Sequence, residues 1–458
     1  LLNSYAAAKG MRFFVTTGNH DPALPLGLVK KNTHFLAADG SRVTREDSCA
    51  GYVSQMECYA DFGFFPRKDD CYWESPFTSY TYDKYAYEDA CRESVLGKRT
   101  YTLCDSLTAT DASYLVEPVE GLWLLAIDGG VYLPKEMKDG KWSYQGSSAG
   151  YNLVLKHKPF LLPWVRKVVE EAQKRHKTLV AFSHYPLVDF NDGVSEHVRR
   201  IWGDRRFDLH RVPEAEVSEA FLQAGLRLHF AGHMHVNDTG IWEGKDGKHL
   251  YNIQVPSIAT YVPAYKILTI ESDEVFRVGT VTLDTVPGFD SLFPLYRAEY
   301  QSDSLKGHSP VWNKEILSAR TYGEFCDYQF RDLVRLRFIP RDLPESWRAC
   351  LDFTGARMLE AVSGEDKSDD ADWTDWCMKD LVLDLYRLRY AERLALEDIP
   401  RTRLAVYRYL FDRACISTFR SAEVEMVKGL GTLFLAFLNG EPCQNFVIDL
   451  KKDVITED

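Results

Sequence analysis

Three short segments of this chain carry histidines in a pattern that suits metal binding. They read GNHD at residues 18–21, SHYP at 183–186 and GHMH at 232–235, and they hold four of the twelve histidines. Imidazole nitrogen favours borderline divalent metals such as Zn, Fe or Mn, and the side-chain amide of Asn19 can add an oxygen ligand. His233 and His235 flank one residue, so on an extended loop both side chains can face the same site. The combination predicts a metal centre built from distant parts of the chain.

Each segment directly follows an apolar run that is expected to form a β-strand. The runs are residues 11–16 (MRFFVT), 178–182 (TLVAF) and 226–231 (LRLHFA). Helices are expected over 159–176, just before the second run, and over 214–224, between the second and the third. Strand, helix and strand with short connections predict parallel or mixed pairing covered by helices. Since ligands bind outside the carboxyl ends of strands in open α/β sheets, we expect the three loops at one edge of the sheet.

In this order and spacing, the three motifs resemble those of the calcineurin-like metallophosphoesterase superfamily. The resemblance covers about residues 1–285. It implies an α/β (α+β) fold, a β-sandwich of mixed sheets flanked by helices, with two divalent metal ions (Mn, Fe, Zn or similar) at one edge. The implied reaction is hydrolysis of a phosphomonoester or phosphodiester by a hydroxide that bridges the two metals and attacks phosphorus in line.

The resemblance also implies a role for each motif residue. It assigns four metal ligands: Asn19, His184, His233 and His235. The first three would bind the second metal, and His235 would bind the first metal. His20 would lie beside the phosphate, where it stabilises the transition state or protonates the leaving oxygen, and Asp21 would hold and polarise His20.

The match is incomplete at its N-terminal side. The family has two earlier motifs, Asp-x-His and Gly-Asp, which supply the remaining ligands of the first metal and the carboxylate that bridges both. Residues 1–17 contain no Asp, Glu or His, and Asn3 is their only amide. The chain also starts at Leu1 and not at Met. We therefore expect that a preceding segment carries the rest of the site and that this chain alone is weakly active or inactive.

Two other functions compete with the phosphoesterase. A non-catalytic binding or scaffold protein on the same fold would also explain an incomplete motif set. A serine hydrolase is disfavoured, because Ser183 and His184 are adjacent strand residues whose side chains point to opposite faces.

Composition limits the partners. The formal net charge is −12, which argues against binding of duplex nucleic acid, since such proteins need a basic surface. It is compatible with a small phosphorylated substrate, because bound metal ions supply positive charge locally. No apolar run approaches the roughly 18 residues of a membrane span, so no transmembrane segment is expected.

Two regions differ in composition and in predicted secondary structure from the part that carries the motifs. Residues 39–110 are rich in Tyr, Asp, Ser and Cys, and they are predicted to form an insertion of loops and short strands on the domain 1–285. This insertion is either a substrate-selecting cap or a peripheral decoration. Residues 286–458 are predicted to form a mainly helical C-terminal domain, with helices at 373–390, 402–414 and 421–438. Such a domain could pack on the catalytic domain or mediate a homo-oligomer.

The ten cysteines leave the cellular compartment open. No CxxC pair occurs, so a zinc ribbon or a thioredoxin-type site is not expected. Free buried thiols would fit a cytoplasmic protein, whereas disulfides, for example within 49–104, would fit an exported one. We favour a periplasmic or secreted location over a cytoplasmic one.

Overall fold

The structure belongs to the mixed α/β class. A computed structural model describes residues 2–21, 29–36, 41–49, 52–104, 107–138, 141–145, 149–305 and 312–458. In these ranges the chain forms a large mixed sheet, a smaller antiparallel sheet and a helical C-terminal region. The expected α/β class and the helical C-terminal region are therefore confirmed.

The large sheet carries two of the motif loops. Among the described residues it contains seven strands in the order β12-β13-β11-β10-β7-β6-β3. Their bounds are Tyr72–Glu74 (β3), Tyr114–Val119 (β6), Leu122–Ile127 (β7), Thr178–Ser183 (β10), Leu228–Ala231 (β11), Asp238–Glu243 (β12) and His249–Gln254 (β13). The four central strands, β7, β10, β11 and β13, are parallel, and the outer ones pair antiparallel. Strands β10 and β11 pair in parallel within a mixed sheet, in agreement with the expected parallel or mixed pairing.

Helices cover one face of the large sheet. They are α5 (Leu161–Lys174) and α7 (Ala215–Gln223), as expected from the sequence. Val165 and Phe221 of these helices share a core with Trp123 and Leu125 of β7, while Leu124 of β7 faces the opposite core. Because β7 is buried on both faces, its sequence is a continuous apolar run and does not alternate.

The second sheet covers the other face. Its described strands lie in the order β14-β15-β16-β17, with bounds Ala264–Ile270, Val275–Thr282, Phe446–Asp449 and Val454–Glu457. Val180 and Ile253 of the large sheet share a core with Phe276 and Phe446 of the small one. Two sheets therefore pack face to face. The last two strands come from the end of the chain, so residues 286–458 do not form a separate unit: their final strands complete this sheet.

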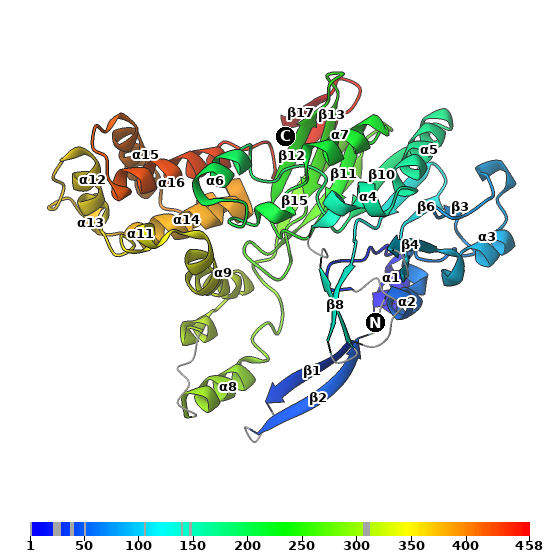
Figure 1. Cartoon of the computed structure of the whole chain (residues 1–458), viewed down its shortest axis with the longest axis horizontal. Helices are drawn as coiled ribbons and strands as arrows, with labels where there is room; N and C mark the ends of the chain where they lie inside the picture. Colours follow the sequence, from blue (N-terminus) through cyan, green and yellow to red (C-terminus); the bar gives the residue numbers. More distant parts are fainter. Residues whose placement is uncertain are drawn as a thin grey trace.

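The helical region lies between β15 and β16 in the chain and to one side of the sheets in space, at the left of Figure 1. Its main helices are Phe293–Leu305 (α8), Tyr322–Leu333 (α9), Gly355–Ser363 (α12), Met378–Ala391 (α14), Arg401–Ile416 (α15) and Ala422–Leu438 (α16). Shorter helices are Ile339–Asp342 (α10), Glu345–Arg348 (α11) and Ala371–Thr374 (α13). The helix expected over 373–390 is interrupted between α13 and α14, because the Asp380 carboxylate accepts a hydrogen bond from the Cys377 backbone N–H at 2.9 Å and starts a new helix there.

The first predicted strand, residues 11–16, is extended but joins no sheet among the described residues. It is held instead by isolated contacts. The Val15 N–H donates to the Phe62 carbonyl at 3.0 Å, and the Tyr114 hydroxyl donates to the Val15 carbonyl at 2.8 Å. The helix before it is α1 (Leu2–Lys9).

The region 39–110 is built into the fold more tightly than expected. It contains the helices Tyr52–Cys58 (α2) and Tyr87–Glu93 (α3) and the hairpin strands Thr100–Cys104 (β4) and Leu107–Thr110 (β5). Its strand β3 pairs with β6 and forms one edge of the large sheet. Tyr72 of β3 stacks on Trp123 at 5.9 Å between ring centroids. The segment thus contributes to the main sheet and does not merely lie on it.

The remaining elements are small. Hairpins are formed by Val29–Leu36 (β1) with Arg42–Cys49 (β2), and by Leu133–Lys138 (β8) with Lys141–Gln145 (β9). The β1–β2 hairpin extends away from the sheets, at the bottom of Figure 1. The short helices are α4 (Val154–His157) and α6 (Ser195–Trp202), and Val198 of α6 packs in the core of the helical region.

The described cysteines form no disulfide. Free thiols, with no disulfide, are found at nine described positions: Cys58, Cys71, Cys91, Cys104, Cys326, Cys350, Cys377, Cys415 and Cys443. The side chain of Cys49 lies outside the description. The expected disulfides within 49–104 are therefore absent from the four described cysteines of that stretch.

In the described part of the chain, no helix has both the length and the apolar character to cross a membrane, as predicted.

Candidate metal centre

Parallel pairing brings two of the motif loops side by side. Strand β10 ends at Ser183 and β11 ends at Ala231, and these two residues are register partners. The SHYP and GHMH segments therefore leave the sheet at the same edge. A backbone hydrogen bond of 3.0 Å from the Gly232 N–H to the His184 carbonyl joins the two loops. These two segments thus lie at the carboxyl edge of the sheet, where the sequence predicts them.

Three predicted ligands converge at this edge. The Nε2 atom of His184 lies 2.9 Å from Oδ1 of Asn19 and 3.0 Å from Nδ1 of His233. Ligands bound to one ion at 2.0–2.2 Å in tetrahedral geometry lie roughly 3.3–3.6 Å apart. Outward shifts of about half an ångström would therefore suffice to admit one divalent ion. The donor set of two imidazoles and one amide oxygen fits such an ion.

The GNHD loop is shaped by contacts that leave little room around His184. A Cβ atom on Gly18 would lie 3.1 Å from Cε1 and Nδ1 of the His184 ring, so only glycine lets the loop approach so closely. The Gly18 N–H donates to Oδ2 of Asp21 at 2.9 Å, and the Tyr132 hydroxyl donates to the Gly18 carbonyl at 2.8 Å. These bonds fix the backbone that presents Asn19.

The helical region packs against the GHMH loop. His233 and His235 have φ angles of 66° and 59°, a left-handed conformation that is unusual for histidine. Met234 and Val236, the residues between and after them, are buried in the core that also contains the helices of the C-terminal region. The Asn237 N–H donates to the Tyr390 carbonyl of α14 at 2.8 Å. Packing on one side of the loop thus fixes the histidines on the other.

Three other predicted residues lie at the rim of the site: His20, Asp21 and His235. His20 and His235 are exposed, and Asp21 is half-buried. The Asp21 carboxylate accepts from the Gly18 backbone, and among the described residues no hydrogen bond joins it to His20. The expected orientation of His20 by Asp21 stays a prediction.

The electrostatics of the site favour the neutral form of His184 and His235. Burial lowers the pKa of His184 to about 4; the Asp21 carboxylate opposes the shift, while His235, His20 and Arg211 add to it. Burial, with help from Arg211 and His20, also lowers the pKa of His235. A neutral imidazole offers a lone pair, which is the form that binds metal ions.

Arg211 also lies near these histidines, although it belongs to none of the three sequence motifs. It lies close enough to influence the pKa values of both His184 and His235, and its Nε atom is buried with no hydrogen-bond partner in the described part of the chain. The neighbouring Asp208 is already paired, at 3.0 Å, with Arg341. A guanidinium in this position suits an oxyanion such as a phosphate or carboxylate, because its planar fork can donate to two oxygens at once.

The alternative Ser–His chemistry is not supported by the geometry. Ser183 Oγ lies 3.0 Å from Nε2 of His229, not against His184, and His229 Nδ1 lies 2.8 Å from Oδ1 of Asn252. His229 and Asn252 are fully buried, and Ser183 is 5 % exposed. This network ties β10, β11 and β13 together and has no access for a substrate.

Comparison with known proteins adds no name to the site: no family model matches this chain, and no curated protein matches it. The assignment of function therefore rests on the motif residues and on their geometry.

Proposed function

We propose that the protein is a metal-dependent phosphoesterase of the calcineurin-like type that hydrolyses a small phosphomonoester or phosphodiester. The observation that carries the proposal is the convergence of Asn19, His184 and His233 within 3.0 Å at the carboxyl edge of the sheet. These residues come from three motifs that are far apart in the sequence.

Each residue of the site has its own role in the proposed reaction. Asn19, His184 and His233 hold a divalent ion, and a lowered histidine pKa keeps the lone pairs available at neutral pH. A bound ion supplies a water of lowered pKa and neutralises phosphoryl charge. Arg211 binds a phosphoryl oxygen. His20, exposed on the loop beside Asn19, is positioned to protonate the leaving oxygen.

The two ions of the proposal rest on different observations. The described residues offer three ligands for one ion, and His235 at the rim offers one for a second. The geometry supports the ion bound by Asn19, His184 and His233, and the ion bound by His235 follows only from the resemblance of the motifs.

Metal binding and hydrolysis together test the proposal. Calorimetry with Mn²⁺ should show saturable binding to the chain, and His184→Ala and His233→Asn should each weaken it by more than about 100-fold, beyond the loss typical of an indirect contact. Asn is chosen at position 233 because it tolerates a left-handed backbone. The matched control is His176→Asn, since His176 is exposed, has a φ of 54° and lies outside the three motifs.

Activity is measured on chromogenic phosphomonoester and phosphodiester substrates in the presence of Mn²⁺. Turnover that is lost in His184→Ala and kept in His176→Asn supports the phosphoesterase. Binding of Mn²⁺ without turnover of either ester, both by this chain and by a chain extended at its N-terminal side, would favour the non-catalytic alternative. A chain that binds no metal in either form would refute both the centre and the activity.

A further inference from the structure

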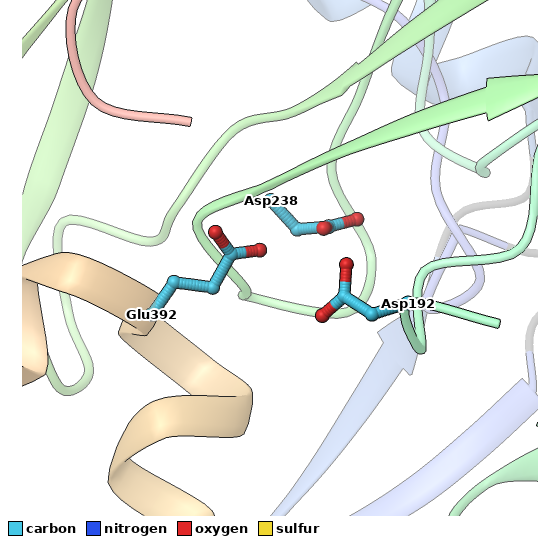
Figure 2. Close-up of side chains that lie close together, drawn as sticks. All are labelled: Asp192, Asp238 and Glu392. Carbon is cyan, nitrogen blue, oxygen red and sulfur yellow. The ribbon is translucent and has the colours of Figure 1, made fainter. Parts of the chain in front are cut away.

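A second group of potential metal ligands lies where the large sheet meets the helical region. Its members are Asp192, in the loop after β10, Asp238, the first residue of β12, and Glu392, directly after α14. One carboxylate oxygen from each lies within 4.8 Å of the other two. Figure 2 shows the three side chains pointing toward one another from three separate elements.

Three oxygen atoms of two of these carboxylates lack a donor, although both side chains are buried. Asp238 and Glu392 are each 2 % exposed. Within the described residues, neither Oδ1 nor Oδ2 of Asp238 has a hydrogen-bond partner, and Oε1 of Glu392 has none. Ionised carboxylates are acceptors only, so they cannot satisfy one another. A buried charge is normally paired with an opposite charge or coordinates a metal ion.

A neighbouring amide adds an independent indication. Gln254 of β13 is the register partner of Asp238 in β12, so both side chains lie on the same face of the sheet. Gln254 is fully buried, and neither its Nε2 nor its Oε1 atom has a hydrogen-bond partner among the residues that the structure describes. An amide oxygen is a suitable ligand for the same cations that carboxylates bind.

The charges around the cluster are unbalanced. Burial, together with neighbouring carboxylates, raises the pKa values of Asp192 and Glu392, and burial raises that of Asp238 to about 6. A neighbouring cation, Lys266, donates from Nζ to Asn237 Oδ1 at 2.5 Å and to Thr280 Oγ1 at 2.7 Å, and so is engaged outside the cluster. One divalent cation together with Lys266 would balance three carboxylates.

We propose that Asp192, Asp238 and Glu392 bind one hard divalent cation, for which Ca²⁺ is the best fit. Ca²⁺ binds oxygen at 2.3–2.6 Å, so ligands on opposite sides of the ion lie up to roughly 5 Å apart, whereas for Mg²⁺ the limit is roughly 4.2 Å. The three oxygens all lie within 4.8 Å of one another, a separation that Ca²⁺ accommodates without movement of the ligands. The oxygen-only ligand set also separates this site from the histidine-rich centre, which selects a different class of metal.

The position of the site indicates its role. Asp238 follows the GHMH loop by three residues, and Glu392 follows the helix whose Tyr390 carbonyl accepts from Asn237. A cation held between them would fasten α14 to the sheet directly behind the loop that presents His233 and His235. The ion would act as a structural clamp and does not require that the phosphoesterase proposal is correct.

The test uses the whole chain freed of metal with a chelator, then titrated with Ca²⁺ in a calorimeter. We expect one saturable site, a melting temperature that rises on addition of Ca²⁺, and weaker competition by Mg²⁺. Glu392→Gln should lower the Ca²⁺ affinity by more than about 100-fold and abolish the thermal shift. The control is Glu441→Gln, which removes an exposed negative charge near Asp192 and should change the affinity by no more than a few-fold.

A second comparison separates this site from the metal centre. His184→Ala should leave Ca²⁺ binding unchanged while it removes Mn²⁺ binding. Absence of saturable Ca²⁺ and Mg²⁺ binding, or unchanged affinity in both Glu392→Gln and Asp192→Asn, would overturn the proposal and identify the cluster as carboxyl groups that stay protonated. The Asn variant at 192 is compatible with the left-handed φ of 47° found there.

Discussion

Replacing Asp238 by Asn should change the stability of the chain with opposite signs in the absence and in the presence of Ca²⁺. Without metal, the folded state must bury an ionised carboxylate at neutral pH. The pKa of Asp238 is raised to about 6 by burial, against about 3.9 in an unfolded chain, and this difference corresponds to about 3 kcal/mol. Asp238→Asn removes that penalty, so in a chelator at about pH 7.5 it should raise the free energy of unfolding by up to about 3 kcal/mol.

The pH dependence provides the internal check. Because the folded pKa of Asp238 lies above the unfolded one, the folded state binds more protons between about pH 4 and pH 6, and stability falls as the pH rises through this range. From about pH 5 to about pH 7.5 the wild-type chain should lose about 1.4 kcal/mol through this residue alone. The Asn variant should lack this part of the slope. Urea unfolding followed by tryptophan fluorescence in a chelator measures both quantities.

Addition of Ca²⁺ should reverse the ranking of the two proteins. The wild-type chain gains stability by binding the ion in its folded state, whereas Asp238→Asn has lost one of the negative charges that attract the ion and gains less. Equal unfolding free energies for the two proteins in chelator at the same pH, or the same sign of the difference with and without Ca²⁺, would refute the reasoning.

Substitutions around the histidine-rich centre give three more measurable outcomes. Gly18→Ala should lower Mn²⁺ affinity by about tenfold or more, since its Cβ would crowd the His184 ring, whereas Gly97→Ala, which meets no atom within 4 Å, should not. Arg211→Gln should raise KM for a phosphoester by about 10–100-fold, the worth of one charge-assisted hydrogen bond; an unchanged KM would exclude a role in binding. Met234→Ala should cost about 2–5 kcal/mol in urea unfolding and weaken Mn²⁺ binding; unchanged metal affinity would show that its packing does not hold the loop.

The parts of the fold that can be predicted from the sequence are those with a strong local pattern. The run TLVAF lies in β10, and the stripe of Val165, Val168 and Ala172 forms the buried face of α5. Residues 11–16 are equally good strand formers, but their pairing depends on a partner that no local pattern specifies. A single helix over 373–390 is wrong, because a capping contact at Cys377 and Asp380 outweighs the continuous apolar spacing.

The candidate site is predictable only where motifs exist. GNHD, SHYP and GHMH each pair a histidine with turn-forming neighbours after an apolar run, and this signal is enough to single out Asn19, His184 and His233. Arg211 and the acidic cluster carry no such signal. Asp192, Asp238 and Glu392 are single acidic residues in separate segments, and only the packing of α14 against the sheet brings them together.

The return of the chain to the small sheet governs the order in which the protein can assemble. Val275 of β15 pairs with Asp449 of β16, so the entire helical region forms a loop whose two ends are joined by a strand pair. Contacts between residues so distant in sequence form slowly, and until they form, β15 presents an unpaired edge to other chains. A fragment that stops near residue 285 would retain this edge permanently, along with an uncovered GHMH loop. The helical region is thus inserted between two strands of the small sheet, and that sheet is completed only by the residues that follow the helices.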